Sequence, residues 1–130
     1  MAITVRVGAT PDVRGVAHAS AQLEDAFDRK GFALALHPLL VEVAGAAADT
    51  CKTRFVRTEG SVVGDGAGDD GIAHVMIGLL PGRSPEVKAR LSEGALELLR
   101  RCVTPGSGLR LHASAEVRDL DASYRKSADA

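Results

Sequence analysis

The chain has 130 residues, which fits one domain, and 45% of them are hydrophobic, enough for a buried core. Its 16 basic and 17 acidic residues give a net charge of −1, which argues against nucleic acid and membrane surfaces as partners. No apolar run approaches the roughly 18 residues that span a bilayer. No basic segment precedes an apolar one at the N-terminus, so we expect a cytoplasmic protein.

The N-terminal residues 3–7 (ITVRV) alternate apolar and polar side chains, which predicts a strand that starts almost at the first residue. The stretch ATPD at 9–12 begins a helix whose apolar stripe continues to Phe27. We expect Gly31 to end this helix.

Residues 32–49 fit less well, because Pro38 disfavours helical backbone at the residue before it. The segment 39–48 is compatible with a second short helix or with a strand-like connection, and we predict the helix. The next segment, CKTRFVRT at 51–58, predicts a strand in which Lys52 and Arg54 share one face with Val56. Two cations on one strand face suit the binding of one anion, although a solvated strand face explains them equally well.

The two cysteines, Cys51 and Cys102, have no metal-ligand spacing, and no base that would activate a cysteine nucleophile is identifiable. We expect reduced thiols. The glycine-rich acidic stretch at 62–71 (VVGDGAGDDG) does not fit the calcium-loop pattern, so it predicts a flexible connection. The sequence therefore predicts no metal and no other cofactor.

Residues 73–80 (AHVMIGLL) predict a strand that is mostly apolar on both faces and is therefore covered on both sides. We interpret His74 as a core histidine, with a role at a subunit interface as the alternative. Ser84 is a good N-cap, Pro85 fits the first helical position, and the helix that follows ends at the stretch TPGSG at 104–108.

The stretch GLLPGRS at 78–84 lacks the spacing and the lysine of a phosphate-binding loop. The Arg83 side chain and the free backbone N–H groups at 84–87 could still hold a carboxylate. The alternative is that Arg83 is only a solvated loop residue, since surface arginines are common.

The stretch LRLHASAEV at 109–117 alternates again and predicts the last strand, before a polar tail at 119–130. The expected fold class is therefore α/β (α+β): two strand–helix–strand units on one four-stranded sheet, with helices on one face. The second sheet face still needs cover, and we expect an oligomer to supply it.

Three stretches together resemble the 5-carboxymethyl-2-hydroxymuconate isomerase family of the tautomerase superfamily: CKTRFV, then HVMIGLLPGRSPEVKARLSEGALELL about twenty residues later, then AEVRDLD. The resemblance covers about residues 50–126. It rests on His74, on the run Gly82-Arg83-Ser84 with Glu86, and on the basic strand start. Residues 1–49 are similar only in pattern and are longer than in the family, and we place the surplus at 32–49, within one domain of 1–130.

This resemblance implies a homotrimer of βαβ repeats whose catalytic base is an N-terminal proline, exposed when the initiator Met is removed. The secondary amine moves a proton between carbons of a small unsaturated keto or enol acid, while cations hold its carboxylates. By position, Lys52 replaces a family arginine, whereas Arg54 and Arg83 match family arginines.

The chain departs from this pattern at position 2, which is Ala2 instead of proline. If Met1 is removed, Ala2 presents a primary amine that could act as the base. We therefore expect Ala2, Lys52, Arg54 and Arg83 to form the site of an isomerase. The alternative is a tautomerase-fold protein without this chemistry, which binds a small anion or has a structural role as an oligomer.

Overall fold

The computed structural model describes residues 2–9, 26–58, 61–104 and 109–127. The helix expected from residue 9 onward lies largely outside these residues. Within these ranges the elements are β1 (Ala2–Ala9), α2 (Arg29–Ala44), the 3-10 turn η1 (Ala48–Thr50), β2 (Lys52–Arg57), β3 (Asp70–Leu79), α3 (Pro85–Cys102) and β4 (Arg110–Asp119).

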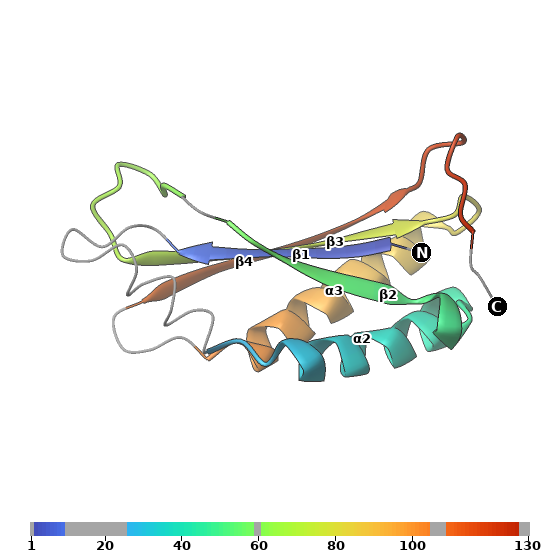
Figure 1. Cartoon of the computed structure of the whole chain (residues 1–130), viewed down its shortest axis with the longest axis horizontal. Helices are drawn as coiled ribbons and strands as arrows, with labels where there is room; N and C mark the ends of the chain where they lie inside the picture. Colours follow the sequence, from blue (N-terminus) through green and yellow to red (C-terminus); the bar gives the residue numbers. More distant parts are fainter. Residues whose placement is uncertain (1, 10–25, 59–60, 105–108, 128–130) are drawn as a thin grey trace.

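The strands form one sheet in the order β2-β1-β3-β4. β1 is parallel to β2, β3 is parallel to β4, and the two central strands β1 and β3 are antiparallel. Each parallel pair is joined by a connection that contains a helix, as parallel neighbours require. Both helices lie on the same side of the sheet (Figure 1). This confirms a mixed α+β fold built from βαβ units.

The core lies between the sheet and the two helices. Its largest fully buried side chains come from the sheet and from both helices: Val5, Val75, Ile77 and Leu79 from the sheet, Phe32, Leu36 and Leu40 from α2, and Leu91 and Leu99 from α3. Phe27 and Phe55 complete the packing with an edge-to-face contact whose ring centroids are 5.6 Å apart. Burial of these side chains is the main stabilising contribution to the fold.

The helix α2 corrects the expectation for residues 31–49. Gly31 does not end a helix but lies in the first turn of α2, where its N–H donates to the Asp28 carboxylate at 3.0 Å. Pro38 lies inside the helix. Proline removes the hydrogen bond to the carbonyl four residues earlier, which here belongs to Leu34, whose side chain is 62% exposed. The helix ends at Ala44 before Gly45, which adopts a left-handed φ of 69°.

The helix α3 follows the expectation closely. The Ser84 hydroxyl accepts a hydrogen bond from the Val87 N–H at 3.2 Å, and Pro85 occupies the first helical position. Leu91, Ala95 and Leu99 recur every four residues and are fully buried. The helix ends at Cys102, and Val103 then forms an isolated bridge with Phe27.

Three strands are longer than their patterns predict, and one of them is β1, which covers Ala2–Ala9 instead of residues 3–7. β3 begins at Asp70 rather than residue 73, which shortens the connection between the two βαβ units. In that connection Gly64 and Gly66 have positive φ values of 58° and 76°, and residues 64–69 are all exposed. β4 continues to Asp119, so the sheet includes Arg118 and also Asp119, the first residue of the predicted polar tail. Among the described helices, none is long and apolar enough to cross a bilayer.

Candidate functional site

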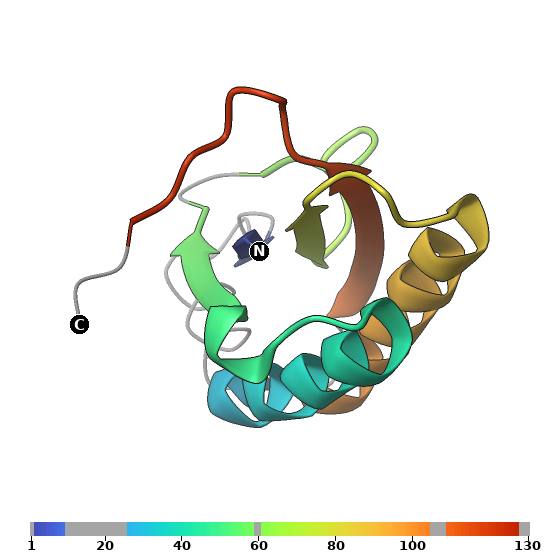
Figure 2. The same cartoon turned by 90° about the vertical axis from the view of Figure 1, so that its right-hand side faces the viewer.

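One end of the sheet gathers most of the predicted site residues. β1 starts at Ala2, whose neighbours across the two adjacent strands are Lys52, the first residue of β2, and Gly78, near the end of β3. The Arg83 loop follows the end of β3 and leads into α3. Figure 2 looks at this end, with the N-terminus near its centre. The structure therefore brings Ala2, Lys52 and the Arg83 loop to the same end of the molecule.

The strand β2 carries the other predicted cation. Lys52, Arg54 and Val56 are exposed, whereas Thr53 and Phe55 alternate with them and are half-buried. Thr53 Oγ1 and His37 Nε2 of α2 form a hydrogen bond of 2.7 Å, so the Thr53 side chain faces the helices. Arg54 therefore lies on the opposite, open face of the sheet. It is two residues farther than Lys52 from the end of the sheet where β1 starts.

The Arg83 side chain is held by the main chain. Its Nε donates to the Ala44 carbonyl at the end of α2, and its Nη1 donates to the Leu80 carbonyl, both at 3.2 Å. The cation also lies at the negative end of the α2 dipole, where it is favourable. A guanidinium has five N–H donors, and these contacts use two of them. Arg83 is thus a half-buried, positioned arginine that fixes the loop before α3.

A chain of polar side chains crosses the open face from β3 to β4. His74 Nδ1 lies 2.7 Å from Ser114 Oγ, and His74 Nε2 lies 3.6 Å from Glu116 Oε1. Arg118 Nη2 donates to the same Glu116 oxygen at 2.8 Å. The interpretation of His74 as a core histidine is therefore wrong, because its side chain is 29% exposed on the open face. The sequence showed that polar residues alternate along this strand, at Ser114, Glu116 and Arg118. It did not show that His74 lies beside them, because that depends on the register between β3 and β4.

A second polar pair lies at the other end of the sheet. His112 Nε2 of β4 contacts Asp70 Oδ1, the first residue of β3, at 2.7 Å. The Asp70 side chain is only 10% exposed. Asp70 was predicted to lie in the glycine-rich connection at 62–71, because aspartates among glycines are typical of a loop. The contact joins the starts of the two parallel strands.

The cysteines are not activated. Burial raises the pKa of the Cys51 thiol, and the charge of Asp49 adds to this effect. Burial likewise raises the pKa of Cys102, with a further contribution from Asp28. Both cysteines are free, as expected. Within the described ranges, no group of three His, Cys, Asp or Glu side chains could hold a metal ion.

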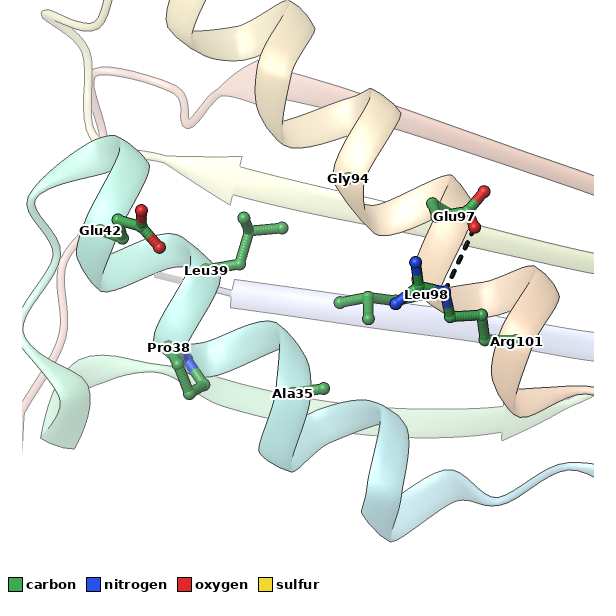
Figure 3. Close-up of a pocket in the computed structure, with 8 residues that line it drawn as sticks. All are labelled: Ala35, Pro38, Leu39, Glu42, Gly94, Glu97, Leu98 and Arg101. Carbon is green, nitrogen blue, oxygen red and sulfur yellow. Dashed lines mark hydrogen bonds and ion pairs between the residues drawn. The ribbon is translucent and has the colours of Figure 1, made fainter.

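A separate groove of about 360 Å³ lies between the two helices (Figure 3). Ala35, Leu39 and Leu98 contribute apolar surface, and the Glu97–Arg101 ion pair lies at one side. A Cβ at Gly94 would lie 2.6 Å from Leu39 Cδ2, so a larger residue there would require the Leu39 side chain to move. The groove is lined by α2 and α3 alone, and the sheet lies behind them. None of the predicted site residues lines it.

Comparison with solved structures shows what this fold resembles. Neither a family model nor a curated protein sequence matches the chain. A 5-carboxymethyl-2-hydroxymuconate isomerase from Deinococcus radiodurans R1 superposes with a TM-score of 0.68 at 16% identity, covering 95% of this chain and 88% of that one. A 5-carboxymethyl-2-hydroxymuconate delta-isomerase gives 0.66 at 16% identity, with 98% and 88% covered.

A fused 4-OT described as a symmetric trimer gives a TM-score of 0.60 at 16% identity, covering 99% of this chain and 93% of that one. The resemblance that the sequence indicates is thus confirmed at the level of the fold. The chain has the fold of these tautomerase-superfamily structures over nearly its whole length.

Proposed function

We propose that this protein is an isomerase that moves a proton between carbons of a small unsaturated keto or enol carboxylate. The N-terminal amine of Ala2, exposed if Met1 is removed, acts as the base. The observation that carries the proposal is the register of β1, in which Ala2 lies between Lys52 and Gly78 at the end where the Arg83 loop begins α3.

The chemistry needs a base that is largely neutral near pH 7 and cations that stabilise the negative charge of the enolate. An α-amino group has an ordinary pKa of about 7.7–8.0, so a useful fraction is unprotonated at neutral pH. Lys52 is the cation nearest to Ala2 in the sheet, and it can attract the carboxylate or the enolate oxygen. Arg54 on the same strand and Arg83 in the loop complete the proposed anion site.

The alternative function is the binding of a small anion without turnover. Two departures from the family pattern favour it. Ala2 replaces the catalytic proline, and a primary amine lacks the ring that fixes the proline nitrogen. Lys52 replaces an arginine and cannot grip a carboxylate with two parallel hydrogen bonds.

The deciding experiment is an ultraviolet assay of the ketonisation of a 2-hydroxymuconate-type dienol. Two preparations are compared, one with Met1 retained and one with Met1 removed, each verified by intact mass. We expect turnover above buffer only in the Ala2-terminated protein, with a further loss of at least tenfold in Lys52→Ala. Equal turnover in both preparations would contradict a role of the Ala2 amine. No turnover in either would leave the anion-binding alternative.

We also propose that the protein forms a homotrimer through the open face of its sheet. Ile72 and Met76 are half-buried apolar residues on that face, and one of the structural neighbours is described as a symmetric trimer. Sedimentation equilibrium would give three times the chain mass of 13.5 kDa. A monomer at micromolar concentration would contradict this proposal. The cytoplasmic location stays a prediction.

A further inference from the structure

The helix α2 is apolar on its outer side as well as on the side that packs in the core. The outer side faces away from the sheet (Figure 1). It carries Leu34 and Val41, whose exposed fractions are 62% and 39%, and Ala35 and Pro38 are exposed beside them. A helix that is apolar all round is normally buried all round. The outer side of α2 is therefore a surface that no other element of the described chain covers.

The shape of this surface suits another helix. Leu34, Pro38 and Val41 follow one another at intervals of four and three residues, so they form one row along α2, which continues to the exposed Lys30. We call these four residues the outer row of α2. A groove runs on each side of it: the groove of about 360 Å³ toward α3 (Figure 3), and a second of about 450 Å³ toward Ala48 of η1. Helices pack by placing such a ridge of side chains in the groove of their neighbour.

The charges of α2 oppose its own dipole. Arg29 and Lys30 lie in the first turn, and Glu42 lies in the last turn. The N-terminal end of a helix is positive and the C-terminal end is negative, so both placements are unfavourable. Among the residues that the structure describes, neither Lys30 nor Glu42 has an ion-pair partner. They are about 18 Å apart along the helix, too far to pair with each other.

We propose that the outer row of α2 binds the same row of a second copy of this chain, with the two α2 helices antiparallel. This orientation places Lys30 beside the partner's Glu42, and the two-fold axis repeats the contact with the roles exchanged. The same register, centred on position 36, places Leu34 opposite the partner's Pro38. The positive end of each helix dipole also lies beside the negative end of the other.

The charge pattern favours a second copy over a different protein, because the surface is complementary to itself. A parallel pair would place like charges together at both ends, whereas the antiparallel pair brings opposite charges together at both ends. The inference goes beyond the proposed function and does not depend on it. The open face of the sheet is on the opposite side of the molecule, so pairing through α2 is compatible with the proposed trimer. It doubles whichever assembly the open face forms, and therefore predicts an even number of chains.

The test measures the particle mass of the purified full chain by sedimentation equilibrium at micromolar concentration and low salt. We expect the wild type to have an even multiple of the chain mass of 13.5 kDa. Leu34→Glu should have half the wild-type mass, because it places a carboxylate in the apolar centre of the contact. Val62→Glu is the matched control, since Val62 is 73% exposed in the connection between β2 and β3. It should leave the mass unchanged.

An exchange of charges tests the antiparallel orientation. Lys30→Glu or Glu42→Lys alone places like charges in contact and should weaken the association about three- to tenfold. The double variant Lys30→Glu/Glu42→Lys restores opposite charges at both contacts and should return to within about twofold of the wild type. Each single change suits the dipole of its own helix, so loss of association would not come from a weaker α2. Circular dichroism checks that every variant keeps the fold.

Three results would overturn the proposal. The first is a wild-type mass equal to that of Leu34→Glu, which would leave the outer row of α2 to solvent or to a different protein. A trimer that Leu34→Glu leaves intact is one such case, and it would retain the association through the open face alone. The second is equal dissociation by Val62→Glu. The third is dissociation by Leu34→Glu with no recovery in the double charge exchange, which would exclude the antiparallel arrangement.

Discussion

The two faces of this sheet differ in composition and in burial. On the covered face, Val75, Ile77 and Leu79 are completely buried against the helices. On the open face, His74, Glu116 and Arg118 form a chain of polar contacts and remain partly exposed. Adjacent residues of one strand therefore contribute to two separate tasks. The covered face stabilises the fold by apolar burial, and the open face is available for association and for ligands.

The sharpest test of this difference compares two neighbouring residues of β3. Ile77→Ala should lower the free energy of unfolding by about 2–5 kcal/mol, because it leaves a cavity in the core. Met76→Ala, on the open face, should cost about 1 kcal/mol or less in the isolated chain. Urea unfolding at low protein concentration measures both. Similar losses in the two variants would contradict the division of the faces.

The Asp70–His112 pair should give the next largest effect, because it is the most buried ionic contact on the open face among the described residues. Asp70→Asn removes the charge that strengthens the hydrogen bond to His112 and should cost about 1–3 kcal/mol in urea unfolding. Asp69→Asn is the control. Asp69 is exposed and adjacent, so its substitution should change stability by about 0.5 kcal/mol or less.

The smallest expected effect concerns Glu116. The hydrogen bond from Arg118 holds the pKa of the Glu116 carboxyl below its ordinary value, and the nearby His74 acts in the same direction. A lowered folded-state pKa contributes stability above the ordinary carboxyl pKa, and that stability is lost as the pH falls through the folded-state value. Because Glu116 is exposed, the contribution to stability is small.

NMR titration of the Glu116 side-chain carboxyl carbon would measure this directly. Arg118→Ala should move the pKa of Glu116 upward, toward the ordinary carboxyl value. An unchanged titration in that variant would show that Arg118 and Glu116 do not interact in solution.

The two helices show how far the sequence determines the fold. α3 could be predicted because Ser84 and Pro85 mark its start and only one of its faces is apolar. α2 could not be delimited, although Phe32, Leu36 and Leu40 follow helical spacing. Pro38 is a strong helix-breaking signal, and Leu34 and Val41 are exposed apolar residues that blur the amphipathic pattern. Packing of the buried residues of α2 against the sheet outweighs the local preference of Pro38 against a helix.

The candidate site was predictable to the extent that it depends on strand starts. Lys52 was identified on one face of a predicted strand and Ala2 from the resemblance to the family, and their proximity follows from a parallel pair. Arg118 was assigned to the region beyond the last strand. Only the register between β3 and β4 aligns it with Gly78, and no local pattern in the sequence encodes that register.

The exposed connection at 64–69 has a consequence for how the chain folds. Each βαβ unit contains its own parallel strand pair, and the antiparallel contact of β1 with β3 joins the two units into one sheet. Cutting the chain between Gly64 and Gly66 would remove no buried side chain. We expect the two resulting fragments to reassemble when mixed, with the β1–β3 contact as the last and concentration-dependent step.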